Sequence, residues 1–326
     1  MTRKFQSIVE TERFRFIGNV ELNKHVSLDE LRDAYDKVVL CFGSAGDNEL
    51  NIDGASKSGN LITARSFVGW YNSHPHFPSL SVKLDRYDTA IIIGNGNVAL
   101  DIARILLKSP QSLESTDISE KAISELKKSK INHVRIVSRR GPMNASFSTK
   151  ELRECVNIAQ LRLNLTQNEF ETHLHPSKRE MRLNKPYKRL MALLSKSAYA
   201  SEQSNANLSK TLSMDFFLSP HSLLTSERNN NGILRCEITK PIDDTVIDQK
   251  VAGTEKYVNQ PRGLIISSIG FKNVLFDERI KLNATGGLKN DRGRLDGLVS
   301  LIFIVFVYIQ IVCILKHLLN YFFCEG

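Results

Sequence analysis

Gly94, Gly96 and Ala99 stand between a buried-type β-branched run and an apolar segment with helical spacing. They fit the pattern G-x-G-x-x-G/A, in which the first glycine permits a tight turn and the second lets a pyrophosphate approach the backbone. The small third residue lets the helix pack closely on the strand, and the helix N-terminus binds phosphate through unpaired N–H groups. These residues predict a dinucleotide site; the alternative is a purely structural turn between a strand and a helix.

A pair of arginines follows the next predicted strand, residues 133–137, in the run Ser138-Arg139-Arg140-Gly141. At this position an acidic residue binds the ribose 2′-hydroxyl of NAD, whereas arginine accommodates the 2′-phosphate of NADP. No carboxylate is present here, and the arginine fork matches phosphate with charge-assisted hydrogen bonds. The pair therefore predicts NADP(H) as the cofactor; the alternative is two solvated arginines on a loop.

The elements that must position these groups alternate between strand and helix. A strand over 89–93, a helix over 97–107 and a strand over 133–137 predict a parallel sheet with right-handed crossovers, an α/β fold of the Rossmann-like type. A polar insertion at 108–130 separates the glycine turn from the second strand, and Asp117 and Glu120 are expected to cap a helix within it. Residues 13–22 alternate as a strand does, and Ser27 with Glu30 predicts a capping box.

Composition narrows the class of protein. A chain of 326 residues usually forms two domains, and the net charge of +9 favours an anionic partner. Nucleic acid is not predicted, because the basic residues are scattered and no nucleic-acid-binding signature accompanies them. The five cysteines contain no C-x-x-C pair, so free thiols and no metal site are expected.

Three segments together carry a resemblance to a known family: "GNGNVALDIARILL", "SRRGPMNASFSTKELRE" and "GLIISSIGFK". From its N-terminus to about Arg294 the chain resembles the mitochondrial NADPH–adrenodoxin (ferredoxin) reductases, which are two-domain FAD-dependent flavoproteins. The resemblance implies a Rossmann-like NADP-binding domain at 47–258, inserted in a partial FAD-binding domain formed by 1–46 and 259–296. Residues 297–326 form an apolar tail outside the family pattern.

The resemblance also assigns residues. It implies that Asn95, Asn97 and Val98 line the NADP site together with Arg139, Arg140 and Glu151, and that the backbone of Leu22 contacts FAD. The basic residues Arg153, Lys185 and Arg189 match a docking patch for an acidic [2Fe-2S] ferredoxin or adrenodoxin. The implied reaction passes electrons from NADPH through FAD to that protein, in mitochondria, with no catalytic side chain.

Two family features have no counterpart in the sequence: the N-terminal Gly-rich FAD fingerprint and the C-terminal segments that close over the flavin. FAD is therefore expected to bind poorly, and the alternative function is a catalytically incompetent variant that only binds NADPH. Leu298–Leu315 is almost wholly apolar over 18 residues, about 27 Å as a helix, just short of a ~30 Å hydrocarbon core. It is interpreted either as a membrane anchor or as a gene-model or splicing artefact.

Overall fold

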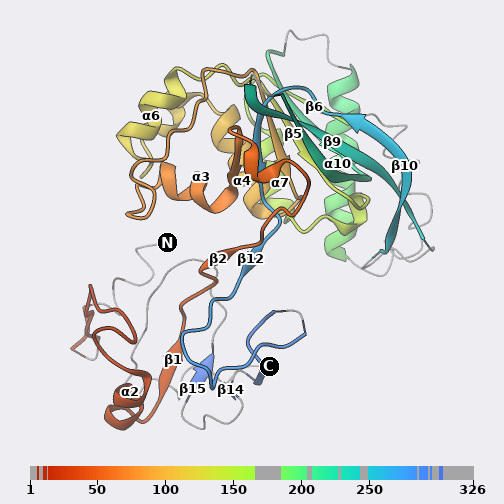
Figure 1. Ribbon diagram of the computed structural model, residues 1–326. Helices are drawn as coiled ribbons and strands as arrows, with labels where there is room; N and C mark the ends of the chain where they lie inside the picture. Colours follow the sequence, from red (N-terminus) through yellow and green to blue (C-terminus); the bar gives the residue numbers. More distant parts are fainter. Residues whose placement is uncertain are drawn as a thin grey trace. The chain divides into compact units, whose positions relative to one another are not determined.

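The computed structural model of the 326-residue chain divides into two compact units, residues 1–48 with 270–326 (unit 1) and residues 49–269 (unit 2) (Figure 1). The sequence prediction drew the divisions at 46/47 and 258/259. The structure describes residues 6, 10–12, 14–165, 185–203, 208–226, 229–242, 249–284, 286–292, 294–295 and 301–303.

Unit 2 contains a six-stranded sheet in which every pairing is parallel. The strand order is β3-β11-β4-β5-β7-β6. Strand β4 is buried at all five positions, as expected for a parallel strand covered on both faces. The strands are β3 (Leu61–Thr63), β4 (Thr89–Ile93), β5 (His133–Val137), β6 (Leu161–Asn164), β7 (Lys210–Asp215) and β11 (Leu264–Ser267).

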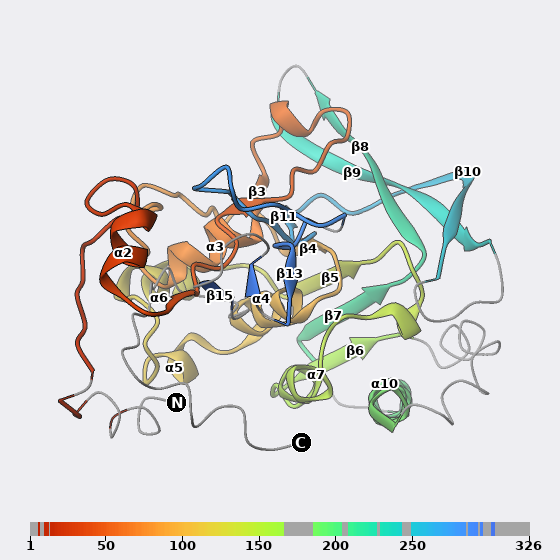
Figure 2. The ribbon, with the colours of Figure 1, turned by 90° about the horizontal axis from the view of Figure 1, so that it is seen from below.

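Helices cover one face of this sheet. Alternate strand residues such as Ile92 and Ile136 join the helices in one hydrophobic core, which includes the fully buried Phe67 and Leu100. Figure 2 shows the helices on one side of the sheet. They are α3 (Ala64–Tyr71), α4 (Asn97–Leu107), α5 (Pro110–Leu113), α6 (Glu120–Lys127), α7 (Thr149–Val156) and α10 (Lys185–Gln203), with a short 3₁₀ turn η2 (Pro142–Asn144).

An antiparallel sheet covers the opposite face. Ile91, Ile93 and Ile265 point to this side and pack with Leu223 and Leu234 in a second core. Unit 2 is therefore a three-layer fold, and its α/β class with a parallel sheet is the one predicted. The covering elements are β8 (Leu218–Ser226), β9 (Asn229–Pro241), β10 (Val251–Asn259) and η1 (Ala55–Lys57).

Unit 1 is small. Its core joins Leu28 and Leu31 of α2 to Val38 and Leu40 of β1 and to Ile280. The elements are α2 (Leu28–Ala34), β1 (Val38–Leu40), β2 (Gly46–Asp47), β12 (Phe271–Lys272), β13 (Asn290–Asp291), β14 (Arg294–Leu295) and β15 (Leu301–Phe303).

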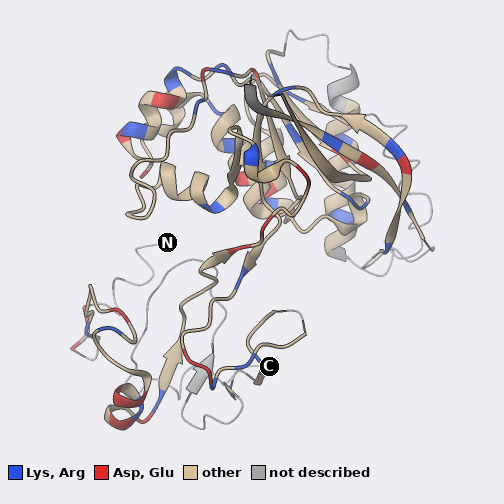
Figure 3. Ribbon diagram, viewed as in Figure 1, with Lys and Arg blue, Asp and Glu red and all other residues tan. Residues whose placement is uncertain are grey.

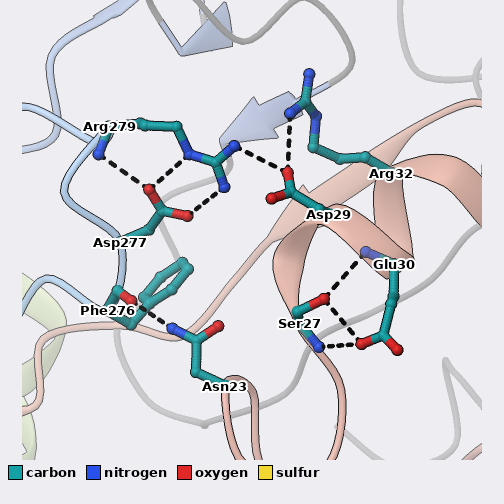
Figure 4. Close-up of polar contacts among 8 residues, drawn as sticks. All are labelled: Asn23, Ser27, Asp29, Glu30, Arg32, Phe276, Asp277 and Arg279. Carbon is teal, nitrogen blue, oxygen red and sulfur yellow. Dashed lines mark hydrogen bonds and ion pairs between the residues drawn. The ribbon is translucent and has the colours of Figure 1, made fainter.

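Polar contacts fasten α2 at its N-terminus (Figure 4). The predicted capping box is confirmed: the Glu30 N–H donates to Ser27 Oγ at 3.2 Å, and the Ser27 N–H donates to Glu30 Oε2 at 2.8 Å. Arg279 forms ion pairs with Asp29 at 2.8 Å and with Asp277 at 2.6 Å, and its side-chain hydrogen bond to Asp277 lowers the pKa of that carboxyl to about 2.

Three expectations about the elements differ from the structure. The strand predicted over 13–22 is absent from its described residues 14–22, where Phe16 and Ile17 are exposed rather than half-buried on a sheet. Helix α6 is capped by Ser119, whose side chain accepts from the Ala122 N–H, and not by Asp117 or Glu120. Strand β11, assigned from the sequence to the flavin domain, pairs with β3 and β4 in unit 2.

Candidate functional site

The glycine turn and the arginine pair begin side by side at the carboxyl edge of the parallel sheet. Ile93, the last residue of β4, pairs with Val137, the last residue of β5, and the Gly94 N–H donates to the Val137 carbonyl at 2.9 Å. Residues that follow these two strands therefore share one edge of the sheet. In doubly wound folds, ligands bind at this edge.

Gly94 and Gly96 are glycine for different structural reasons. Gly94 has φ +111°, and a Cβ there would lie 2.3 Å from the Ser268 carbonyl oxygen, so only glycine fits. Gly96 has ordinary extended backbone with φ −94°, and a Cβ there would meet no atom within 4 Å. The turn therefore needs Gly94 for its own shape, whereas Gly96 leaves open space beside the backbone.

Helix α4 begins at this open space. Gly96 is its N-cap and contributes no side-chain cap, while its carbonyl accepts from the N–H groups of Ala99 and Leu100. The fully buried Ala99 packs the first turn of the helix against the core, as the small third position predicts. The first N–H groups of an 11-residue helix thus remain available to an anion, with the helix dipole favouring negative charge.

Ser146 and Ser148, to which the sequence analysis assigned no role, form hydrogen bonds with the turn. The Ser146 N–H donates to the Asn95 carbonyl at 3.1 Å, and Ser146 also forms an isolated β-bridge with Gly96. The Ser148 N–H donates to Asn97 Oδ1 at 2.7 Å. No local motif signals these contacts, because 51 residues separate Asn97 from Ser148.

The site also contains an orphaned polar atom. Asn95 Nδ2 is buried and has no hydrogen-bond partner within the described part of the chain. An amide donor in this state costs free energy unless a ligand or water pairs with it. The unpaired donor, the open side of Gly96 and the uncapped helix N-terminus fit a bound pyrophosphate.

Hydrogen bonds to its backbone carbonyl groups hold the turn that carries the two arginines. Thr239 Oγ1 donates to the Arg139 carbonyl at 2.7 Å, and Ser138 Oγ donates to the Arg140 carbonyl at 3.1 Å. Arg139 is exposed and Arg140 is half-buried. Neither guanidinium pairs with a carboxylate among the described residues, which leaves both available for an anion.

The remaining predicted site residues lie at different places. Val98 is in the first turn of α4, and Glu151 is in the first turn of α7, where its N–H donates to Ser148 Oγ at 3.3 Å. The structure thus gathers Val98 and Glu151 with the glycine turn, through the contact of Ser148 with Asn97. Leu22 is in unit 1, half-buried against that unit's core, and forms a β-bridge with Val26.

The predicted docking residues lie on two helices that share the core of unit 2. Arg153 is exposed on α7 and Arg189 is exposed on α10, and α7 packs against α10. Lys185 is the first residue of α10, and its side chain lies outside the described residues. Figure 3 shows that Lys and Arg also occur on other helices and strands, so basic charge is not confined to this pair.

A buried thiol joins α7 to α4. Cys155 donates to the Leu100 carbonyl at 3.2 Å, and burial raises the pKa of this thiol to about 12. Such a cysteine is protonated at neutral pH and is not a nucleophile. Cys155 and Cys236 are free thiols as predicted, while Cys313 and Cys324 lie outside the described residues.

The apolar segment Leu298–Leu315 lies outside the described residues except for β15. Within the residues that the structure does describe, no helix combines the length and apolar character that crossing a membrane requires.

Comparisons with known proteins show which proteins the chain is similar to. No family model matches the chain. It is 38% identical over 294 residues to the mitochondrial NADPH:adrenodoxin oxidoreductase of Arabidopsis thaliana, covering 89% of this chain and 60% of the relative. It is 36% identical over 297 residues to the protein of that name from Bos taurus, covering 89% of this chain and 59% of the relative. The chain thus spans about 60% of the length of these curated relatives.

A solved structure gives the same result for the fold. The structure of Mycobacterium tuberculosis FprA in complex with NADPH superposes with a TM-score of 0.81 at 31% identity, covering 94% of this chain and 65% of FprA. The chain is also 47% identical to the NADPH-ferredoxin reductase FprA over 158 residues, 48% of this chain and 34% of the relative.

Proposed function

From the premise that this chain is homologous to the NADPH:adrenodoxin oxidoreductases over 89% of its length, we propose that it is an oxidoreductase of that kind, with NADPH bound at the Gly94–Ala99 turn. The observation that carries the proposal is the pairing of Ile93 with Val137. This pairing brings the uncapped N-terminus of α4 and the arginine turn to one edge of the sheet.

The chain's own groups have separate roles in this binding. The N–H groups at the start of α4 bind the pyrophosphate, and the absence of a side chain at Gly96 lets it come close to the backbone. Arg139 and Arg140 bind the 2′-phosphate by charge-assisted bonds, each typically worth about 1.5–3 kcal/mol. Asn95 Nδ2, unpaired within the described residues, gains an acceptor.

The flavin part of the proposal rests on homology. When bound, FAD accepts a hydride from NADPH and supplies electrons singly. The N-terminus of α2 in unit 1 offers no phosphate site, because the capping box of Ser27 and Glu30 already occupies it. Among the described residues of unit 1, only the backbone of Leu22 is assigned to FAD.

The proposed electron acceptor is an acidic [2Fe-2S] ferredoxin or adrenodoxin, and the proposed location is the mitochondrion. The names of the relatives, which include adrenodoxin and mitochondrial, support both proposals. Arg153, Arg189 and Lys185 form the proposed docking patch on α7 and α10. Exposed cations such as Arg153 and Arg189 steer an acidic partner and make its association depend on salt.

The cofactor assignment is tested by replacing both Arg139 and Arg140 with alanine. We expect NADPH affinity to fall tenfold or more while NADH affinity hardly changes, because only NADPH carries the 2′-phosphate. Arg162 is an exposed arginine on β6, and the control Arg162→Ala should alter neither affinity. Equal losses for NADPH and NADH would contradict the assignment.

A second candidate function is NADPH binding without turnover. The self-capped N-terminus of α2 favours it, since no described helix of unit 1 then offers a phosphate site. Purification with added FAD, removal of free flavin and a visible spectrum before and after anaerobic NADPH distinguish the two. A flavin band that bleaches supports the reductase; a colourless protein that still binds NADPH supports the second candidate.

A further inference from the structure

A second orphaned polar atom lies at the same edge of the sheet. Ser267 is 7% exposed, and its Oγ is buried with no hydrogen-bond partner within the described ranges. It is the last residue of β11 and pairs with Ile93 of β4 and Thr63 of β3. Neither the motifs nor the resemblance in the sequence assigns it a role.

The chain immediately after Ser267 is part of the glycine turn's surroundings. The Ser268 N–H donates to the Ile93 carbonyl at 2.8 Å, and the Ser268 carbonyl is the group that excludes a Cβ at Gly94. The end of β11 therefore lies directly against the turn proposed to bind the pyrophosphate. Only glycine fits at position 94, because the chain leaving β11 lies against it.

The strand order decides which part of a dinucleotide reaches Ser267. Strand β4 lies between β5 and β11, so the arginine turn and Ser267 flank the glycine turn on opposite sides. A dinucleotide lies across this crevice with its pyrophosphate at the central turn. If Arg139 and Arg140 take the phosphorylated adenosine half, the nicotinamide half extends over the end of β11.

Resting on the proposed function, we propose that Ser267 is a positioning residue whose hydroxyl hydrogen-bonds the nicotinamide half of NADP(H). A serine hydroxyl both donates and accepts, so it suits a ribose hydroxyl or a carboxamide equally. Rotation about its Cα–Cβ bond redirects Oγ without moving the strand. A hydroxyl that has no partner among the described residues then gains one on binding.

Ser213 provides a matched control. It is a 3% exposed serine in β7 of the same sheet, and its Oγ accepts from Asn164 Nδ2 at 3.1 Å. Ser213→Ala removes a satisfied bond, so it should lower Tm. Ser267→Ala removes an unsatisfied group, so the free protein's Tm should stay equal to or rise above that of the wild type.

The test measures binding of NADP⁺ and of 2′,5′-ADP, which lacks the nicotinamide half, to the full chain by titration calorimetry. For Ser267→Ala we expect NADP⁺ to bind about three- to tenfold more weakly, the loss of one neutral hydrogen bond, with 2′,5′-ADP affinity within about twofold of wild type. Ser213→Ala should bind both ligands as the wild type does.

Two results for Ser267→Ala overturn the inference: unchanged NADP⁺ affinity, or equal weakening for both ligands. A wild-type chain that binds neither ligand refutes the proposed function itself and the inference with it. If the wild type binds 2′,5′-ADP, and Ser267→Ala binds both 2′,5′-ADP and NADP⁺ as the wild type does, only the role of Ser267 is refuted.

Discussion

Replacing each glycine of the turn with alanine distinguishes the glycine needed for folding from the glycine needed for binding the pyrophosphate. Gly94→Ala places a methyl group 2.3 Å from the Ser268 carbonyl at φ +111°. Gly96→Ala places the same methyl group in open space at φ −94°. We therefore expect the first substitution to destabilise unit 2 and the second to leave it folded while obstructing the pyrophosphate.

The magnitudes follow from these geometries. At Gly94 the backbone strain costs about 1–3 kcal/mol and the steric overlap about another 1–3 kcal/mol. A loss of at least about 2 kcal/mol lowers Tm by at least about 4–8 °C for a domain of this size. At Gly96 the poorer N-cap and the reduced entropy of the unfolded chain each contribute under about 1 kcal/mol with opposite signs. Tm should therefore stay within about 2 °C of wild type.

Thermal unfolding and titration with NADP⁺ measure the two effects. Gly96→Ala should bind NADP⁺ at least about tenfold more weakly, about 1.4 kcal/mol, at an unchanged Tm. Wild-type NADP⁺ affinity in Gly96→Ala would refute the pyrophosphate assignment. A wild-type Tm in Gly94→Ala would refute the contact between Ser268 and the turn.

Three further outcomes are expected. At pH 8 iodoacetamide should leave Cys155 unmodified in the folded protein and label it once the chain is unfolded in urea, as peptide mass spectrometry will show, because burial raises the pKa of Cys155 to about 12. Rapid labelling of Cys155 in the folded protein would contradict the packing of α7 on α4. Asp277 has a folded pKa of about 2, below its unfolded value near about 3.9, so its stabilising contribution is complete above about pH 4 and lost as pH falls through about 2. Urea unfolding of Asp277→Asn and wild type should therefore converge over that range, and a constant difference would argue against the ion pair with Arg279. Replacing Arg153 and Arg189 with alanine should slow association with an acidic ferredoxin about tenfold in low salt and much less at about 0.5 M salt, by stopped flow; an equal loss at both salt concentrations would exclude steering.

Local patterns predicted the central part of the site. The glycine turn, its flanking strand and helix, and the strand that ends at Val137 have the predicted types and adjacency, because short-range sterics and burial determine them. The capping box at Ser27 was predicted for the same reason. The strand predicted over 13–22 was wrong because alternation alone does not bury a segment: Phe16 is 70% exposed.

Long-range placement was not predictable from one sequence. Strand β11 lies between β3 and β4 although some 170 residues separate it from β4 in the chain, and no local feature of "GLIIS" encodes those partners. For the same reason the contact of Ser148 with Asn97 and the unpaired hydroxyl of Ser267 were missed. Each depends on which strands are neighbours.

The way in which the arginine turn is held has an evolutionary consequence. Thr239 and Ser138 bond the carbonyl oxygens of Arg139 and Arg140, which every amino acid possesses, so the turn's conformation does not require these two side chains. Under the proposed role of the two arginines, an acidic residue at position 140 should exchange NADP for NAD without rebuilding the loop. Under that proposal cofactor choice and fold can change independently, and redesign of one leaves the other intact.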